Sequence, residues 1–245
     1  MPAKGNFMNS ILQVKDLKKV YEEKVIFEDI TFDLYENQII SILGPSGIGK
    51  TTLLNIISGI DDEFYGSVNI KSSFSNKKEN FAFSQSKDLL IPWKNVLDNA
   101  VFGLELSGIK KEKSYPIAKK LMTDFYLDGS ECKFPHQLSK GMKQRVSLIR
   151  SFLTDRPVLL LDEPFSPLDS ITRDDLQDWL INLLKKHNKS VVLVTHDIDE
   201  ALKLSNKLIV LNNNPANIVD EIDINKKSNL VNLKVKIKGL LKRNE

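Results

Sequence analysis

Apolar and polar residues alternate along the first third of the chain, which is the pattern of a β-strand buried on one face. After a glycine-rich loop, apolar residues recur every three or four positions over 50–60, which predicts a helix that ends at Gly59. The alternation then returns. The strands predicted in this third are 11–17, 25–34, 38–43, 66–70 and 80–84.

The middle of the chain, 88–155, has helical spacing and no strand pattern. The helices predicted here are 95–106, 118–127 and 143–153. On the first of them, one face collects Val96, Leu97, Ala100, Val101 and Leu104. Three helices without an intervening strand indicate a separate helical subdomain.

The last third returns to strands that alternate with helices. The runs 158–161 and 191–194 are continuously apolar, as expected of parallel strands covered on both faces. Between them, an amphipathic helix is marked by Leu176, Leu180, Leu183 and Leu184. Strands at 207–211 and 218–224 follow. The alternation predicts the α/β class.

Composition narrows the possible environments. The chain has 245 residues with 41% hydrophobic content, which is enough for a sizeable core. Its single cysteine, Cys132, suits a reducing compartment. No run approaches the roughly 20 apolar residues that cross a bilayer, and no secretory signal precedes the first strand. We therefore expect a soluble protein whose role at a membrane, if it has one, depends on a partner.

Basic residues concentrate in the last twenty positions, 226–245, and the rest of the chain is mildly acidic. We therefore expect no nucleic-acid partner. In a helix, one face of this tail would carry Leu230, Leu233, Ile237, Leu240 and Leu241. Such a helix can touch anionic lipid or a partner, but a solvated charged face is the commoner case.

The glycine-rich loop carries the first chemical signal. Gly44, Gly49, Lys50 and Thr51 match the pattern G-x-x-x-x-G-K-[ST], with a predicted strand before it and a predicted helix after it. Small residues let backbone N–H groups converge on phosphates, and the helix N-terminus favours negative charge. Lys50 would neutralise the β- and γ-phosphates, and Thr51 would bind magnesium. The alternative is a glycine turn with an exposed lysine, which the flanking elements disfavour.

A second signal is the buried strand that ends in Asp162 and Glu163. Asp162 would hold magnesium directly or through water, and Glu163 would accept a proton from the attacking water or orient it. The Asp-Glu-Pro sequence could also cap a helix. Beside the glycine loop, the catalytic interpretation is favoured.

Four stretches together resemble the nucleotide-binding subunit of an ATP-binding cassette transporter. They are "GPSGIGKTT", "QLSKGMKQR", "LLLDEPFSPLD" and "LVTHD", in the family's order and separations. The resemblance extends from about residue 11 to 224 and implies an ATPase with ATP and Mg²⁺ as cofactors. It also implies a RecA-like P-loop NTPase core with an antiparallel β subdomain and an inserted α-helical subdomain. The domains expected are 8–87 with 156–225 as the core, 88–155 as the helical subdomain and 226–245 as a basic tail.

The resemblance also implies residue roles. Tyr21 would stack on adenine, and Gln85 would sense magnesium and water. The nucleotide would be held by Tyr21, Gly44, Pro45, Ser46, Gly47, Gly49, Lys50, Thr51, Thr52, Ser139, Gly141 and Asp169. The catalytic residues would be Glu163, His196 and Gln85, and the metal ligands Thr51, Gln85 and Asp162.

Taken singly, several of these residues have ordinary structural interpretations. Tyr21 reads as a half-buried strand aromatic, His196 as a structural histidine, and Ser139 with Gly141 as a helix N-cap. Only their joint placement favours the functional roles. One departure stands out in "LSKGM" (138–142), the stretch similar to the family's signature motif: Lys140 replaces the first of its two adjacent glycines. This lysine could restrict the loop and slow hydrolysis, but it can also point outward, and we expect activity to survive.

A signature motif that completes a phosphate site must serve the site of a second copy, so the resemblance implies a head-to-tail pair with two ATP molecules between the copies. Within the family, "LLIPWKNVLDNAVFGLEL" and "NNNPANIVDEIDI" resemble importers of nitrate, sulfonate, taurine or vitamin precursors. The partners implied are a membrane permease and, indirectly, an external solute-binding protein. The subunit would then lie at the cytoplasmic face of the membrane. Trp93 would face the permease or be a core tryptophan.

Four other functions are weighed at this point. One is a soluble cassette ATPase of DNA repair or translation, and a related one is the ATPase of another transporter branch. A phosphate-loop kinase or GTPase would leave the signature and His196 unexplained. A non-catalytic subunit would leave the complete set of Lys50, Asp162 and Glu163 unexplained.

Overall fold

The computed structural model describes residues 10–71, 80–166, 168–225 and 229–242. By its internal contacts the chain divides into two compact units. Unit 1 comprises Met1–Asn80 and His187–Glu245, and unit 2 comprises Phe81–Lys186. These units do not coincide with the domain bounds expected from the sequence, and those bounds stay a prediction.

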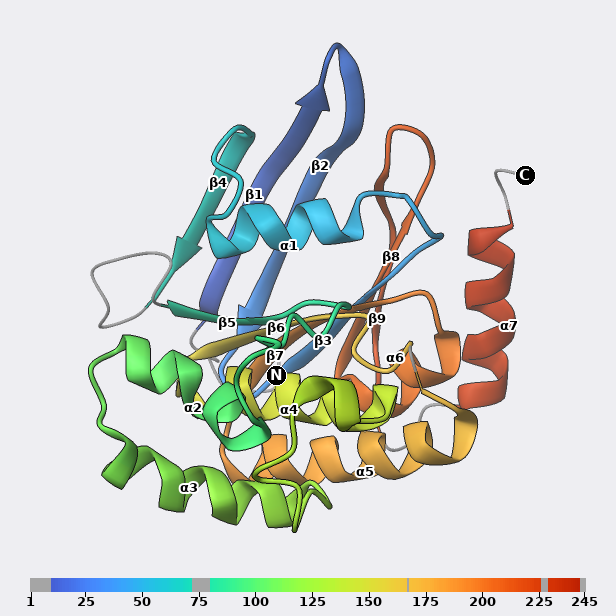
Figure 1. Ribbon diagram of the computed structural model, residues 1–245. Helices are drawn as coiled ribbons and strands as arrows, with labels where there is room; N and C mark the ends of the chain where they lie inside the picture. The colour runs from blue at the N-terminus through green and yellow to red at the C-terminus, as the bar shows by residue number, and fades with distance from the viewer. Residues whose placement is uncertain (1–9, 72–79, 167, 226–228, 243–245) are drawn as a thin grey trace, which may run out of the picture. The chain divides into compact units, whose positions relative to one another are not determined.

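An antiparallel sheet forms the first layer of unit 1. Its strands are β1 (Ser10–Tyr21), β2 (Lys24–Tyr35) and β4 (Tyr65–Ile70), in the order β2-β1-β4 (Figure 1). The alternation in the sequence is confirmed, because inward-facing side chains such as Leu12, Val14 and Phe32 are buried.

The second sheet of unit 1 is mostly parallel. Its strands β7 (Ser190–Thr195), β3 (Ile39–Leu43) and β8 (Lys207–Asn212) run parallel, and β9 (Asn217–Asp223) pairs antiparallel with β8. Every residue of β7 is buried, as its continuous apolar run predicted, and every residue of β3 is buried as well.

Three helices lie in the described part of unit 1. Helix α1 (Lys50–Ser58) ends at Gly59, whose φ of 77° is left-handed, as predicted. Helix α6 (Ile198–Leu204) was not predicted, because a seven-residue helix is too short to show a clear period. It is specified instead by Asp197, whose carboxylate accepts hydrogen bonds from the Asp199 and Glu200 amides.

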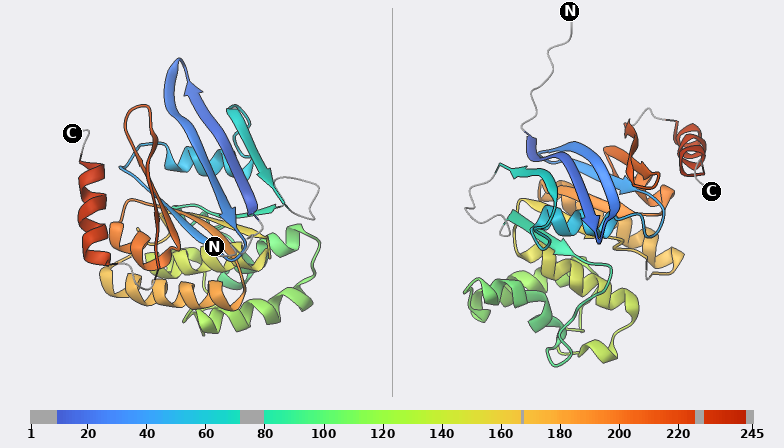
Figure 2. Two further views of the ribbon diagram at one scale, coloured as in Figure 1. Left: turned by 180° about the vertical axis from the view of Figure 1, so that it is seen from behind. Right: turned by 90° about the horizontal axis from the view of Figure 1, so that it is seen from above.

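The third helix is α7 (Leu230–Leu241), near the C-terminus (Figure 2). One face of it packs against other elements of unit 1. Ile237 is fully buried in a cluster with β8, β9 and α6. Two ion pairs flank it, from Lys234 Nζ to an Asp199 oxygen at 2.5 Å and from Lys236 to Asp220 at 2.6 Å. The apolar face predicted for the tail is thus packed against other elements, while most of the helix's other side chains are exposed, as a solvated charged face requires.

Unit 2 combines a parallel strand pair with helices. Strands β5 (Phe81–Ser84) and β6 (Val158–Asp162) pair in parallel. The helices are α2 (Val96–Leu106), α3 (Lys111–Asp124), α4 (Lys140–Leu153) and α5 (Ser170–Lys186), after the 3-10 turn η2 (Pro135–Gln137). The apolar faces predicted for α2 and α5 are buried.

Candidate nucleotide-binding site

The glycine loop, residues 44–49, connects buried strand β3 to helix α1 in unit 1. Gly47 and Gly49 have φ angles of 80° and 105°, which L side chains rarely adopt. A Cβ at Gly49 would stand 2.9 Å from Ile26 Cγ2, and one at Gly44 would stand 2.9 Å from the Leu211 carbonyl oxygen. Glycine is therefore required for this loop path, which leaves its backbone open to a ligand.

Lys50, the first residue of α1, points its side chain back into the loop. Its side chain is buried, and Nζ donates hydrogen bonds of 2.9 Å to the carbonyl oxygens of Gly44 and Pro45. Gly49 caps α1 without a side chain, so the first-turn N–H groups that a helix leaves unbonded internally are not shielded by a capping side chain. Thr51 is exposed in that turn and Thr52 is half-buried. An ammonium group and a helix N-terminus at one loop fit a polyphosphate.

His196 lies beside the loop in the same unit. Strands β3 and β7 pair in parallel, with Leu43 opposite Thr195. The next residue after each strand is Gly44 and His196, respectively. His196 and the first residue of the loop therefore lie at the same edge of the sheet. The His196 side chain is exposed. This arrangement allows a histidine to contact an anion held by the loop.

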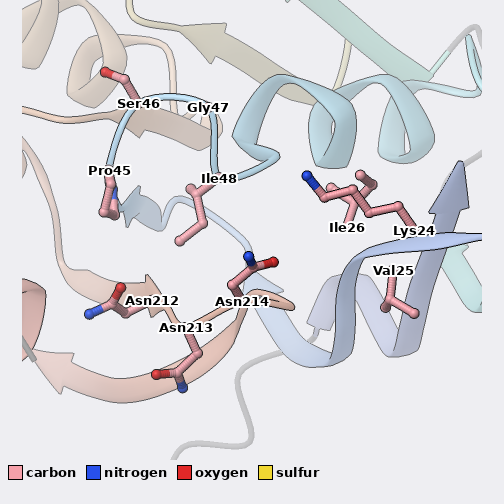
Figure 3. Close-up of a pocket in the computed structure, with 10 residues that line it drawn as sticks. All are labelled: Lys24, Val25, Ile26, Pro45, Ser46, Gly47, Ile48, Asn212, Asn213 and Asn214. Carbon is pink, nitrogen blue, oxygen red and sulfur yellow. The ribbon is translucent and has the colours of Figure 1, made fainter. Parts of the chain in front are cut away.

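Tyr21 ends strand β1 and pairs with Lys24 at the start of β2. Tyr21 is 45% exposed, which agrees with a half-buried strand aromatic and also leaves part of the residue accessible to a ligand. A pocket of about 280 Å³ lies between the start of β2, the glycine loop and the β8–β9 turn. Figure 3 shows its lining, with the Ile48 side chain pointing from the loop toward the asparagines of that turn. The lining residues are Lys24, Val25, Ile26, Pro45, Ser46, Gly47, Ile48, Asn212, Asn213 and Asn214.

Unit 2 brings the acidic residues and Gln85 to one edge. Strands β5 and β6 pair with Ser84 opposite Leu161, so the residues that follow are Gln85 and Asp162. Asp162 is 3% exposed, and Glu163 has a left-handed φ of 45°. A non-glycine residue in this conformation is uncommon and redirects its side chain away from the strand's regular course. A buried carboxylate and a neighbouring amide oxygen suit Mg²⁺.

The signature residues begin helix α4. Ser139 is its N-cap and accepts a hydrogen bond of 3.2 Å from the Met142 amide. Gly141 packs closely, since a Cβ there would stand 3.2 Å from Leu168 Cδ2. Lys140 is exposed in the first turn of the helix, without a left-handed φ, so this position does not require glycine. Asp169 accepts a hydrogen bond of 3.0 Å from the Thr172 amide and so begins α5.

Sequence reasoning missed two sets of residues near these sites. The first set is the ion pair of Lys19 and Asp61, which contacts Tyr21. The second is Asn212, which lines the pocket and whose side-chain amide donates a hydrogen bond of 2.7 Å to Leu240 O near the C-terminus of α7. The available signal for Lys19 was a lysine on the apolar face of an alternating strand. Trp93 is 78% exposed, so the alternative of a core tryptophan is wrong.

Neither a metal cluster nor a membrane span was found in the described parts of the chain. No three acidic, histidine or cysteine side chains gather there in a way that could hold a metal. None of the described helices is both long and apolar enough to cross a bilayer. In nucleotide sites Mg²⁺ commonly takes one or two protein ligands and completes its shell with phosphates and water, so such a site does not need a cluster of three. The metal ligands expected from the resemblance, Thr51, Gln85 and Asp162, stay a prediction.

Comparisons with known proteins agree with these features. The family described as "ABC transporter" matches residues 27–166. An uncharacterized ABC transporter ATP-binding protein, MJ0412 of Methanocaldococcus jannaschii, is 39% identical over 90% of this chain and 85% of its own length. The taurine import ATP-binding protein TauB of Escherichia coli K12 is 39% identical over 88% of this chain and 85% of its own length.

A solved structure shows the same fold. The dimeric post-hydrolysis state of the ATP-binding cassette MJ0796, bound to ADP and Pi, superposes with a TM-score of 0.76 at 27% identity, covering 88% of this chain and 99% of that one. The fold expected from the resemblance, a P-loop NTPase cassette, is thus confirmed. The chain therefore belongs to the ABC transporter family, in which it is an ATP-binding subunit and an ATPase that uses ATP with Mg²⁺.

Proposed function

We propose that the chain energises the import of a small solute of the nitrate, sulfonate, taurine or vitamin-precursor class. The importer assignment is supported by the 39% identity to taurine import ATP-binding proteins, over 88% of this chain. The observation that carries the ATPase role is the glycine loop, which wraps Lys50 and begins beside His196.

In unit 1 the proposed ligand is the triphosphate. Lys50 and the N–H groups of the loop would bind the β- and γ-phosphates, His196 would contact the γ-phosphate, and Thr51 would bind Mg²⁺. Bound ATP supplies the phosphoanhydride bond, and Mg²⁺ offsets the charge of its phosphates. The glycines that leave the backbone open, and the buried position of Lys50, support this assignment.

In unit 2 the proposed roles are metal binding and water activation. Asp162 and Gln85, at one strand edge, would hold Mg²⁺ directly or through water. Glu163 would take a proton on its carboxylate from the attacking water, or orient that water. Its left-handed backbone supports such a role, because strained residues cluster at functional sites.

We further propose a head-to-tail pair of identical subunits. Ser139 and Gly141 of one copy would contact the γ-phosphate held by the other, together with its Asp169. The exposed N-terminus of α4, with Ser139 as cap, supports phosphate contact there. The dimeric cassette MJ0796 supports the assembly. Charge-assisted hydrogen bonds of about 1.5–3 kcal/mol each would hold the pair, and loss of the γ-phosphate would open it.

The proposed membrane partner is a permease, with the subunit at the cytoplasmic face and a solute-binding protein acting through that permease. Leu89 and Trp93 expose 52% and 78% of their surface after Gln85. Arg150 holds this segment, with guanidinium bonds of 2.8 Å to Leu89 O and 2.9 Å to Asp88 O. Exposed apolar side chains beside such an anchored stretch suit contact with another protein.

Reconstitution tests this function. The chain and a permease that copurifies with it are placed in proteoliposomes, and Mg²⁺-dependent ATP hydrolysis is measured with the solute-binding protein, with and without taurine, nitrate or thiamine. One solute should stimulate hydrolysis and accumulate in an ATP-dependent manner. Turnover that requires a phosphoacceptor, or no coupling to any solute, would contradict the proposal.

A further inference from the structure

Tyr21 is held by two charged side chains. Its hydroxyl donates a hydrogen bond of 2.9 Å to Asp61 Oδ2. Lys19 Nζ lies 4.4 Å from the centroid of the Tyr21 ring, within the range of a cation–π contact. The same ammonium donates to Asp61 Oδ1 at 2.8 Å and to the Glu63 carbonyl oxygen at 2.5 Å. One ring face and the hydroxyl are thus both anchored.

The cost of this cluster suggests a role beyond stability. Lys19 is 1% exposed, and burying an ion pair generally gains little stability over apolar side chains. Burial is the largest single influence and opposes the charged form of both partners. The hydrogen bonds and charges around them together outweigh it, so the pKa of Lys19 is raised and that of Asp61 is lowered. The adjacent Lys18 pairs with Glu28 at 3.2 Å on the surface, so this strand also accommodates an exposed ion pair.

The cluster also lies close in sequence to the glycine loop as well as to Tyr21. Helix α1 begins directly after the glycine loop, and Asp61 follows its last residue, Ser58, by three positions. Tyr21 in turn pairs with Lys24, which shares the pocket with the loop. One short helix therefore relates the phosphate-binding turn to the anchor of the aromatic ring.

Resting on the proposed function, in which Tyr21 stacks on the base of ATP, we propose that Lys19 and Asp61 are positioning residues for that stacking. They fix both side-chain torsions of Tyr21, so that the ring's exposed portion is presented to a purine without the entropy cost of ordering a free side chain. The pair acts on the base end of the nucleotide and leaves the phosphate end unaffected.

Two ligands distinguish an effect at the base end of the nucleotide from an effect at its phosphate end. Dissociation constants for MgATP and for inorganic tripolyphosphate, which has no base, are measured by calorimetry for wild type, Asp61→Ala, Tyr21→Phe and Tyr21→Ala. We expect Asp61→Ala and Tyr21→Phe to raise the dissociation constant for MgATP about three- to tenfold, because each loses the hydrogen bond between the Tyr21 hydroxyl and the Asp61 carboxylate. Tripolyphosphate affinity should stay within about twofold. KM for ATP should rise more than kcat falls.

Lys18→Met is the matched control, since it removes an exposed lysine from the same strand and should leave both dissociation constants unchanged. Circular dichroism verifies folding, and Tyr21→Phe keeps the test valid if Asp61→Ala does not fold. The double variant Tyr21→Ala with Asp61→Ala should bind MgATP no worse than Tyr21→Ala, because Asp61 acts through the ring.

The remaining outcomes overturn the inference in distinguishable ways. If Tyr21→Ala weakens MgATP while Asp61→Ala and Tyr21→Phe bind like wild type, stacking stands and the positioning role is wrong. Equal loss of both ligands in Asp61→Ala would show an effect on α1 and the phosphate end. If Tyr21→Ala itself binds MgATP like wild type, the proposed role of Tyr21 fails first.

Discussion

Gly49 and Glu163 both have a positive φ, in different settings. At Gly49 the loop passes so close to Ile26 that no Cβ fits, so the position requires glycine. Glu163 adopts a positive φ despite carrying a side chain, and the buried strand β6 before it holds the chain in place. At the residue scale, close packing explains the glycine at the first position, and the proposed chemistry accounts for the conformation at the second.

Glu163→Gln tests the proposed general base. The substitution removes a proton acceptor and keeps the shape, so ATP hydrolysis should fall about 100-fold or more while ATP binding persists. Gel filtration with MgATP should show the variant as a dimer. A monomer that binds ATP would argue against the shared site.

Gly49→Ala tests the loop path. A left-handed alanine costs about 1–2 kcal/mol, and its Cβ would also collide with Ile26, so MgATP should bind about tenfold more weakly or worse by calorimetry. Gly239→Ala is the control, because that helical glycine has open space around it. This variant should gain about 0.5–1 kcal/mol in unfolding free energy and keep its ATP affinity.

At the scale of elements, α7 shows how one helix can be specified by a few contacts. Its apolar face covers β8 and α6, while Val231 and Val235 on the other side are 72% and 68% exposed. The lysine-rich face, predicted to be solvated, also supplies the ion pair from Lys234 to Asp199.

Ile237→Ala should therefore lower the free energy of unfolding by about 2–4 kcal/mol, since it leaves a cavity under the helix. The exposed Val235→Ala should change it by less than about 0.5 kcal/mol. Chemical denaturation measures both. Equal effects would mean that α7 is not docked in solution.

Asp98 connects α2 to α3 and gives a pH-dependent prediction. Burial alone would raise its pKa, but hydrogen bonds from Lys111, at 2.6 Å, and from Tyr115 outweigh burial and lower it. The stability gained is present above the unfolded pKa of about 3.9 and is lost as the pH falls through the lower folded pKa.

Asp98→Asn should accordingly cost about 1 kcal/mol of unfolding free energy at pH 7, because Lys111 is half-exposed and the pair is partly screened. The difference between wild type and variant should shrink below about pH 4. Urea denaturation at pH 7 and pH 3 measures this difference in unfolding free energy. A difference that is larger at pH 3 would contradict the lowered pKa of Asp98.

At the scale of the whole molecule, function requires partners that bind exposed surfaces. Trp93→Ala should reduce recovery of the chain with permease-containing membranes severalfold, because a central aromatic often dominates an interface. ATPase activity in solution should be unchanged. Leu106→Ala, which removes a side chain that is 74% exposed, should have no effect on recovery. Equal recovery of both variants would place the contact elsewhere.

The sequence by itself determined the main strands and helices, the glycine loop and the family. These features depend on local spacing, and the period of apolar residues is visible wherever an element is long enough. Such spacing identifies an apolar face without identifying what covers it. Docking of α7 and exposure of Trp93 were decided by tertiary structure.

Tertiary structure also decided the surroundings of Tyr21. The ion pair joins Lys19 to Asp61, from a strand and from the turn after a helix. Neither residue has a sequence neighbour that reveals the other, because contacts between distant segments form only when the chain folds. Local chemistry at the phosphate end was therefore readable from the sequence, whereas the anchor at the base end depended on the fold.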